Sequence, residues 1–131
     1  MRSVDYRIQP TLTSDELNEL FGRVWNDHAP TDLSLVLDHS LTFVCAYDGD
    51  DLIGYVNVAW DGGQHAFLLD TSVDRSRRRE GIGTRLVRHA IAEVQRRGIK
   101  WLHVDFEPYL EQFYRSCGFQ HTTAGLTRLN D

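Results

Sequence analysis

Two glycines beside three consecutive arginines form the segment of this chain whose residue types and spacing are best suited to binding a ligand. The sequence SRRREGIGTRL runs from Ser76 to Leu86 and places Gly81 and Gly83 directly before a stretch whose apolar periodicity predicts a helix. The first turn of a helix exposes unpaired backbone N–H groups and a partial positive charge, and glycine lets a phosphate approach them closely. Arginine side chains add charge-assisted hydrogen bonds to phosphate oxygens. The segment therefore predicts a site for a phosphate-containing ligand.

The distribution of charge supports a local anion site. The 131-residue chain has a formal net charge of −5, yet residues 75–100 hold nine Lys/Arg against two acids, Glu80 and Glu93. The rest of the chain holds five basic and seventeen acidic residues. A surface for a nucleic-acid backbone requires a broad basic face with few acids, so nucleic acid is not expected as a partner.

Two familiar nucleotide-binding loops do not fit these residues. A Walker A loop needs a lysine after its last glycine, whereas Gly83 is followed by a threonine and an arginine. A dinucleotide fingerprint needs a third glycine at the position of Leu86. Asp105 and Glu107 do lie where a ribose-binding acid would follow the next strand. However, the strands before the loop predict antiparallel pairing, which does not make a dinucleotide-binding half.

The elements that must position this loop follow from turn signals and apolar periodicity. Strands are predicted at Val4–Pro10, Leu41–Tyr47, Leu52–Trp60, His65–Val73 and Ile99–Phe106. Helices are predicted after the capping-box pair Thr13 and Glu16, and at 33–39, 83–97 and 108–117. A last pair of strands is predicted near Phe119–Thr122 and Gly125–Leu129.

These elements predict an α+β (mixed α/β) fold. The helix at 83–97 connects the strands at 65–73 and 99–106 into one βαβ unit, which implies one parallel strand pair. The three strands before that helix are joined by Asp-Gly and Gly-Gly turns and predict an antiparallel meander. We therefore expect a mixed, mostly antiparallel sheet with helices on both faces and one crossover, in a single domain over residues 1–131.

Composition indicates a soluble, cytoplasmic globular protein. Hydrophobic residues make up 41% and charged residues 25% of the chain, which are ordinary globular values. No apolar run approaches the roughly 20 residues of a membrane span, and the N-terminus lacks the apolar stretch of a signal peptide. Cys45 and Cys117 have neither disulfide-framework nor metal-site spacing. Neither a membrane partner nor a metal is expected.

Two motifs together resemble those of the GNAT superfamily of acetyl-CoA-dependent N-acetyltransferases. The sequence RREGIG at Arg78–Gly83 is similar to that family's pyrophosphate loop, Arg/Gln-x-x-Gly-x-Gly/Ala, and Val73 precedes it at the family spacing. Thirty residues further on, FYRSCGF at Phe113–Phe119 is similar to the family's aromatic-Tyr-x-x-x-Gly-Phe signature. The predicted order of elements also matches, so the resemblance covers nearly the whole chain.

The resemblance implies that acetyl-CoA is the cosubstrate. The backbone of Thr71, Ser72 and Val73 would pair with the pantetheine arm where two strands splay apart. The pyrophosphate would lie against the side chains of Arg78 and Arg79 and the amides of Arg79, Glu80, Gly81, Ile82, Gly83 and Thr84. Arg77 is expected to be a solvated flank of this loop.

The resemblance also implies a general acid. Tyr114 occupies the family position from which a phenol protonates the departing thiolate, while a backbone N–H near Val73 polarises the thioester carbonyl. A phenol with a pKa of about 10 is close enough to a thiol of about 8.5 to serve as the donor. The alternative role of Tyr114 is that of a core aromatic residue.

The general base stays open among four residues. Asp70 belongs to the strand before the loop, and His103, Asp105 and Glu107 belong to the next strand, which we expect to be central. Polar and apolar residues alternate in WLHVDFE, so these polar groups share one face, where burial would perturb their pKa values or pair them structurally. Glu107 replaces the family's usual asparagine and could instead attract or deprotonate a cationic amine.

We therefore expect an N-acetyltransferase that acts on a small-molecule amine, with Asp61 among the acids that would favour a cationic one. A protein or peptide N-acetyltransferase and a non-catalytic acyl-CoA-binding regulatory domain are the alternatives. Many members of the family dimerise through their C-terminal strands, so the resemblance also suggests a homodimer.

Overall fold

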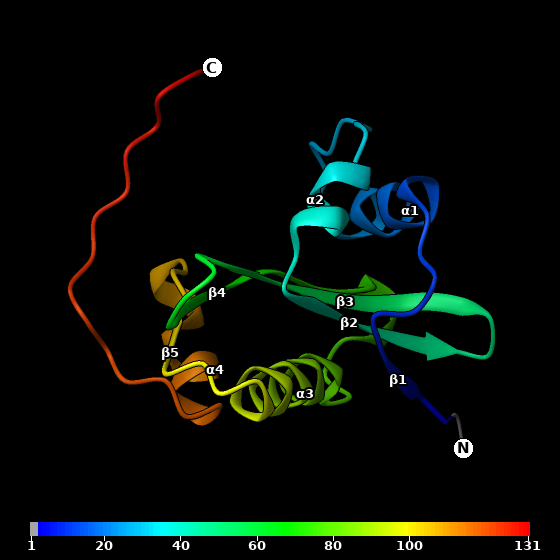
Figure 1. Ribbon diagram of the computed structural model, residues 1–131. Coiled ribbons are helices and arrows are strands. Elements are labelled where there is room, and N and C mark those ends of the chain that lie inside the picture. The colour runs from blue at the N-terminus through cyan, green and yellow to red at the C-terminus, as the bar shows by residue number, and fades with distance from the viewer. Residues whose placement is uncertain (1–2) are drawn as a thin grey trace.

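A five-stranded sheet organises residues 3–131, which the computed structural model describes (Figure 1). The strands lie in the order in which they occur in the chain: β1 (Asp5–Ile8), β2 (Thr42–Asp48), β3 (Asp51–Trp60), β4 (His65–Val73) and β5 (Trp101–His103). The first four pair antiparallel, and β5 pairs with β4 in parallel. The predicted mixed sheet with one crossover is confirmed.

Helices cover both faces of this sheet (Figure 1). On one face lie α1 (Ser14–Val24) and α2 (Ser34–His39). On the other face lie α3 (Ile82–Arg96) and α4 (Glu111–Ser116), each preceded by a short 3-10 turn, at Arg75–Arg77 and Pro108–Leu110 respectively. Within residues 3–131, no helix combines the length and the apolar character that a membrane span requires.

Local sequence signals explain where α1 begins and which face it buries. Thr13 Oγ1 accepts a hydrogen bond from the Glu16 amide at 3.1 Å, and the Glu16 carboxylate accepts one from the Thr13 amide at 3.1 Å. This reciprocal capping box satisfies two N–H groups at the helix N-terminus. The apolar face then packs on the sheet through the buried side chains of Leu17, Leu20, Phe21 and Val24.

The opposite core lies between α3 and the sheet. Leu86, Val87, Ala90 and Val94 lie on the buried face of α3. This face packs against inward-facing residues of β2, β3 and β4. Burying one such Val or Leu side chain contributes about 1.5–3 kcal/mol. These contacts hold the N-terminus of α3 against the end of β4, where the glycine segment connects the two elements.

Two predictions about the C-terminal part of the chain are wrong. The strand expected at 99–106 shortens to three residues and lies at the edge of the sheet, so it is not central. The strand pair expected after Gly118 does not form, and residues 120–131 run away from the body of the molecule (Figure 1). A strand is stabilised by pairing with a neighbour, and this segment joins no ladder within the described chain.

Candidate active site

The C-terminal half of β4 has one free edge, which pairs with no other strand in the described chain. The parallel ladder joins His65, Ala66 and Phe67 to β5, after which β5 ends and β4 continues to Val73. On its other side, β4 remains paired with β3 as far as Val73. The backbone at 71–73 can therefore accept hydrogen bonds from, and donate them to, an extended ligand on the side that β5 has left.

A β-bulge lies next to this free edge. Leu69 pairs with Asn57, and Ser72 pairs with Tyr55, so that Asp70 and the residue after it share a single partner on β3. Asp70 has a φ of 58°, which is uncommon for a residue with a side chain. The Ser72 hydroxyl donates to the Asp70 carbonyl at 2.7 Å and stabilises this turn of the backbone. Bulges of this kind redirect side chains.

Asp70 keeps access to solvent, but neighbouring groups crowd its carboxyl. This desolvation raises the pKa of Asp70 above its ordinary value. Tyr55 lies beneath the α1 face, and its buried hydroxyl has no hydrogen-bond partner within the described part of the chain. Burial, and secondly the charge of Asp70, raise the pKa of Tyr55. The sequence did not single out Tyr55. Its apolar neighbours in the strand predict a core aromatic residue and give no sign that its hydroxyl lacks a partner.

Tyr114 faces the free edge of β4 from α4. Its hydroxyl donates to Thr71 Oγ1 at 3.3 Å. Its ring is 7% exposed and packs against Phe106, Phe113 and Phe119 at centroid distances of 4.9, 4.8 and 5.9 Å. Burial raises the pKa of Tyr114, so the phenol keeps its proton at neutral pH. Tyr114 is therefore a core aromatic residue whose hydroxyl is held at Thr71.

The glycine segment turns sharply into α3. Gly81 is the N-cap residue and has a φ of 78°, a conformation that glycine adopts without steric cost. Arg79 also has a positive φ, 65°. Gly83 follows in the first helical turn, where backbone N–H groups lack intrahelical partners. The exposed side chains of Arg78 and Arg79 have no hydrogen-bond or ion-pair partner within residues 3–131, so both are available to an anion.

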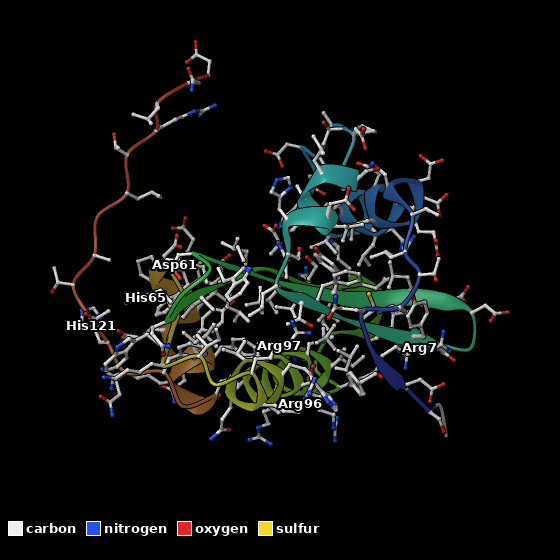
Figure 2. The ribbon with its side chains drawn as sticks, in the orientation of Figure 1. Arg7, Asp61, His65, Arg96, Arg97 and His121 are labelled. Atoms are coloured by element: carbon white, nitrogen blue, oxygen red, sulfur yellow. The ribbon has the colours of Figure 1, made fainter. Side chains whose placement is uncertain are left out.

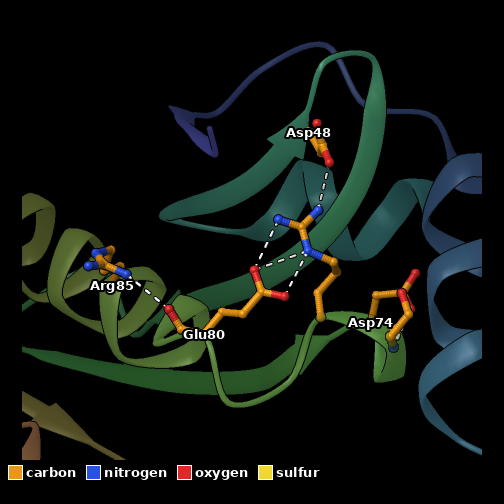
Figure 3. A network of polar contacts seen from close by, with 6 residues as sticks. Asp48, Asp74, Glu80 and Arg85 are labelled. Atoms are coloured by element: carbon orange, nitrogen blue, oxygen red, sulfur yellow. Dashed lines mark hydrogen bonds and ion pairs between the residues drawn. The ribbon is translucent and has the colours of Figure 1, made fainter. Parts of the chain in front are cut away.

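Arg77 is not the solvated flank that the sequence predicts, since its side chain is 3% exposed. Its guanidinium donates to both carboxylate oxygens of Glu80, at 3.0–3.1 Å, and to Asp48 Oδ2 at 2.7 Å (Figure 3). The loop is thereby tied to the β2–β3 hairpin. The Glu80 carbonyl also accepts from Arg85 at 3.2 Å. The Glu80 carboxylate is thus engaged by Arg77.

A cavity of about 560 Å³ lies behind this ion pair, between α1 and the β2–β3 hairpin. Its walls carry six carboxylates against two guanidiniums; the acidic residues are Glu16, Glu19, Asp48, Asp50, Asp51 and Asp74. This excess of negative charge disfavours a pyrophosphate there. The free edge of β4 and the N-terminus of α3 therefore remain the better candidate site.

The other acids proposed from the sequence do not form a buried group. Asp105 and Glu107 are exposed and follow the end of β5. His103 is also exposed and pairs with His65, their ring nitrogens being 2.8 Å apart. Exposed and half-buried residues do alternate from Trp101 to Glu107, as the sequence predicts. The polar face is solvated because β5 is an edge strand.

Comparisons with known proteins agree with this geometry. The model of the acetyltransferase (GNAT) family matches residues 11–119. A GNAT family acetyltransferase from Streptococcus pneumoniae TIGR4 superposes with a TM-score of 0.84 at 25% identity, covering 98% of each chain. No curated protein matched.

Two more distant solved structures share the fold. One is the aminoglycoside N-acetyltransferase AAC(6')-Iy in complex with CoA, with a TM-score of 0.77 at 15% identity, covering 99% of this chain and 96% of the other. The second is glucosamine-6-phosphate N-acetyltransferase from Arabidopsis thaliana, with a TM-score of 0.75 at 14% identity, covering 97% and 99%.

Proposed function

This chain belongs to the GNAT acetyltransferase family, and from that premise we propose that it transfers an acetyl group from acetyl-CoA directly to the amine of a small molecule. One observation carries the proposal. The free edge of β4, the glycine turn into α3 and the Tyr114 hydroxyl meet at the same place, with Tyr114 bonded to Thr71. A small-molecule acceptor is supported by the aminoglycoside and aminosugar substrates named for structural neighbours.

The loop residues fit a pyrophosphate in the proposed complex. Arg78 and Arg79 would form charge-assisted hydrogen bonds with its oxygens. The amides from Arg79 to Thr84 would add backbone donors at the positive end of the α3 dipole. Thr71, Ser72 and Val73 would pair with the amide groups of the pantetheine arm. Each of these roles uses groups that lie on one continuous path from the helix N-terminus along β4.

Arg77 acts as a positioning residue in this proposal. Its ion pairs with Glu80 and Asp48 hold the segment in which Arg79 and Gly81 adopt positive φ values. A loop fixed in this way presents its amides without first losing conformational freedom, and such preorganisation favours binding.

The reaction needs two proton transfers, one from the amine to a base and one from an acid to the departing sulfur. The amine nitrogen attacks the thioester carbonyl carbon, the carbon–sulfur bond breaks, and Tyr114 gives its proton to the sulfur. A backbone N–H near Val73 would stabilise negative charge on the carbonyl oxygen. Asp70 is our proposed base for the amine proton, because its raised pKa makes the carboxylate a better acceptor. Asp105 and Glu107, which follow the shortened β5, and His103 at its end are less suited, because all three are exposed at the edge of the sheet.

A homodimer is supported by the C-terminal segment. Leu126 and Leu129 are 90% and 83% exposed, and the segment leads away from its own sheet. The outer edge of β5 has no neighbouring strand within the described residues. Exposed edges and extended segments pair readily between identical chains. We assign residues 120–131 to pairing with a second copy.

The test is release of free thiol from acetyl-CoA in the presence of a panel of amines. Amine-dependent release supports the proposal, and mass spectrometry of the product should show an added acetyl group. Tight binding of acetyl-CoA without turnover would favour a non-catalytic regulatory domain. Turnover confined to peptides would favour a protein N-acetyltransferase.

A further inference from the structure

A row of exposed side chains crosses β4 and β5 on the face that carries α1 and α2. We call it the aromatic strip, and it consists of His65, Phe67, Leu69, Trp101 and His103. Strand alternation places them together, because Ala66, Leu68 and Leu102 pack into the α3 core and their neighbours must face the other way. Register confirms the grouping, since His65 lies beside Trp101 and Phe67 beside His103.

The strip is exposed because α1 and α2 stop short of it. Both helices lie over β2 and β3, and the sheet beyond them is uncovered (Figure 1). Phe67, Leu69 and Trp101 are 39%, 37% and 54% exposed. Contiguous exposed apolar surface of this kind marks a ligand or partner site more often than isolated exposed residues do.

The rings of the strip are held in place before any ligand arrives. His103 stacks on Phe67 at 4.8 Å between centroids, with their planes 18° apart. His65 Nδ1 and His103 Nε2 lie 2.8 Å apart, so one imidazole donates and the other accepts. His65 and Asp61 lie together at the start of β4 (Figure 2), where the His65 amide donates to Asp61 Oδ1 at 3.3 Å. Such fixed planar surfaces bind flat ligands at low entropic cost.

The strip is continuous with the proposed acetyl-transfer site. Leu69 directly precedes the bulge, so the strip ends where Asp70 and Thr71 begin the free edge of β4. A molecule lying on the strip would therefore reach the proposed thioester position with one end, where Asp70 supplies negative charge.

We propose that the aromatic strip binds the body of the acceptor, and that the acceptor is a primary amine on a flat aromatic group. This inference rests on the proposed function. The aromatic group would stack on Phe67 and His103, and the ammonium would lie toward Asp70. A polyhydroxylated aminosugar would instead place hydroxyl groups against apolar surface, where they find few hydrogen-bond partners.

The experiment compares kcat/KM for 2-phenylethylamine, n-hexylamine and glucosamine at saturating acetyl-CoA, in the wild type and in the variants Phe67→Ala, Phe67→Tyr and Trp60→Ala. Phe67→Ala removes the centre of the strip. Trp60→Ala is the matched control, because Trp60 is 43% exposed but opposes Ala66 on the α3 face. Saturation-transfer NMR of 2-phenylethylamine with CoA present supplies a readout that needs no turnover.

We expect 2-phenylethylamine to be the best of the three acceptors. Phe67→Ala should raise its KM about tenfold through lost stacking and contact area, leaving the KM for acetyl-CoA unchanged, and Phe67→Tyr should restore binding. Trp60→Ala should have no effect. Thermal melting of each variant checks that the fold is intact.

Two results would overturn the inference while leaving acetyl transfer intact. One is turnover in which glucosamine or n-hexylamine is preferred and Phe67→Ala changes no KM. The other is a Phe67→Ala protein that loses a dimer, which would assign the strip to a second copy. If no amine is acetylated and Phe67-dependent binding of 2-phenylethylamine persists, the proposed function fails and the binding site stands. If both are absent, both fail.

Discussion

The Tyr114 hydroxyl donates a 3.3 Å hydrogen bond to Thr71 Oγ1, which joins α4 to the free edge of β4 although 43 residues separate them in the chain. This contact fixes the direction of the phenolic proton. It also places that proton beside the backbone that we propose for the pantetheine arm.

Replacing Tyr114 with phenylalanine should lower kcat at least tenfold, which is the scale of lost general-acid catalysis. The Phe106, Phe113 and Phe119 contacts of the ring remain, so the fold and the affinity for acetyl-CoA should persist. Steady-state kinetics and calorimetric binding of CoA measure the two effects. Tyr109→Phe is the matched control, because Tyr109 is 81% exposed. An unchanged kcat in Tyr114→Phe would remove this residue from the mechanism.

Arg77→Met should raise the KM for acetyl-CoA severalfold and leave the KM for the amine nearly unchanged. The substitution keeps the apolar part of the side chain but removes the ion pairs to Glu80 and Asp48, so the loop loses the contacts that tie it to the β2–β3 hairpin. Arg96→Met is the control, since Arg96 is 67% exposed and pairs with Glu93 at the far end of α3. Equal effects of the two substitutions on the KM for acetyl-CoA would contradict a positioning role for Arg77.

Replacing both Arg78 and Arg79 with alanine should weaken the binding of acetyl-CoA more than Arg77→Met does. Each hydrogen bond to a charged group contributes about 1.5–3 kcal/mol, so the double alanine variant should raise the KM for acetyl-CoA by roughly tenfold or more. The KM for the amine should change little, and higher salt should reduce the difference from the wild type. A rise confined to the amine KM would break the pyrophosphate assignment.

Asp70→Asn should lower kcat/KM at least tenfold and remove the acidic limb of its pH profile. Desolvation raises the pKa of Asp70 above 3.8, so the wild-type limb should lie above that value and activity should fall as the carboxylate takes up its proton. A raised carboxyl pKa also means that the ionised form destabilises the folded state above that pH. Asp70→Asn should therefore melt no lower than the wild type at pH 7. Loss of the limb in Asp105→Asn instead would reassign the base.

Deleting residues 121–131 should convert a dimer into a monomer. The removed segment contributes an exposed polar contact within its own chain, between His121 Nδ1 and Glu111 Oε1 at 3.4 Å. Such a contact adds at most about 1 kcal/mol, so the melting temperature extrapolated to low protein concentration should change little. Light scattering of the full and shortened chains measures their masses. The same number of chains per particle in both proteins would contradict pairing through this segment.

Much of the fold could be predicted because its signals are local. The capping box of Thr13 and Glu16, the turn glycines between strands and the positive φ at Gly81 each depend on residues a few positions apart. The glycine segment was also predicted as an anion site from charge and helix-terminus chemistry alone. The presence and order of the elements through α4 followed from these patterns.

The amino-acid sequence by itself determined which segments form strands and helices up to α4, which glycines make the loop, and where the positive charge gathers. Only the tertiary structure decided that Arg77 is buried between Glu80 and Asp48, and that His103 and Asp105 lie at a solvated edge. It also decided that Tyr114 meets Thr71 and that residues 120–131 leave the sheet. The reason is physical: periodicity records which face of an element is apolar, whereas burial and partnership depend on which distant segment packs there. Arg77 and Arg78 are neighbours of the same type, and packing alone buries the side chain of Arg77 and leaves that of Arg78 exposed.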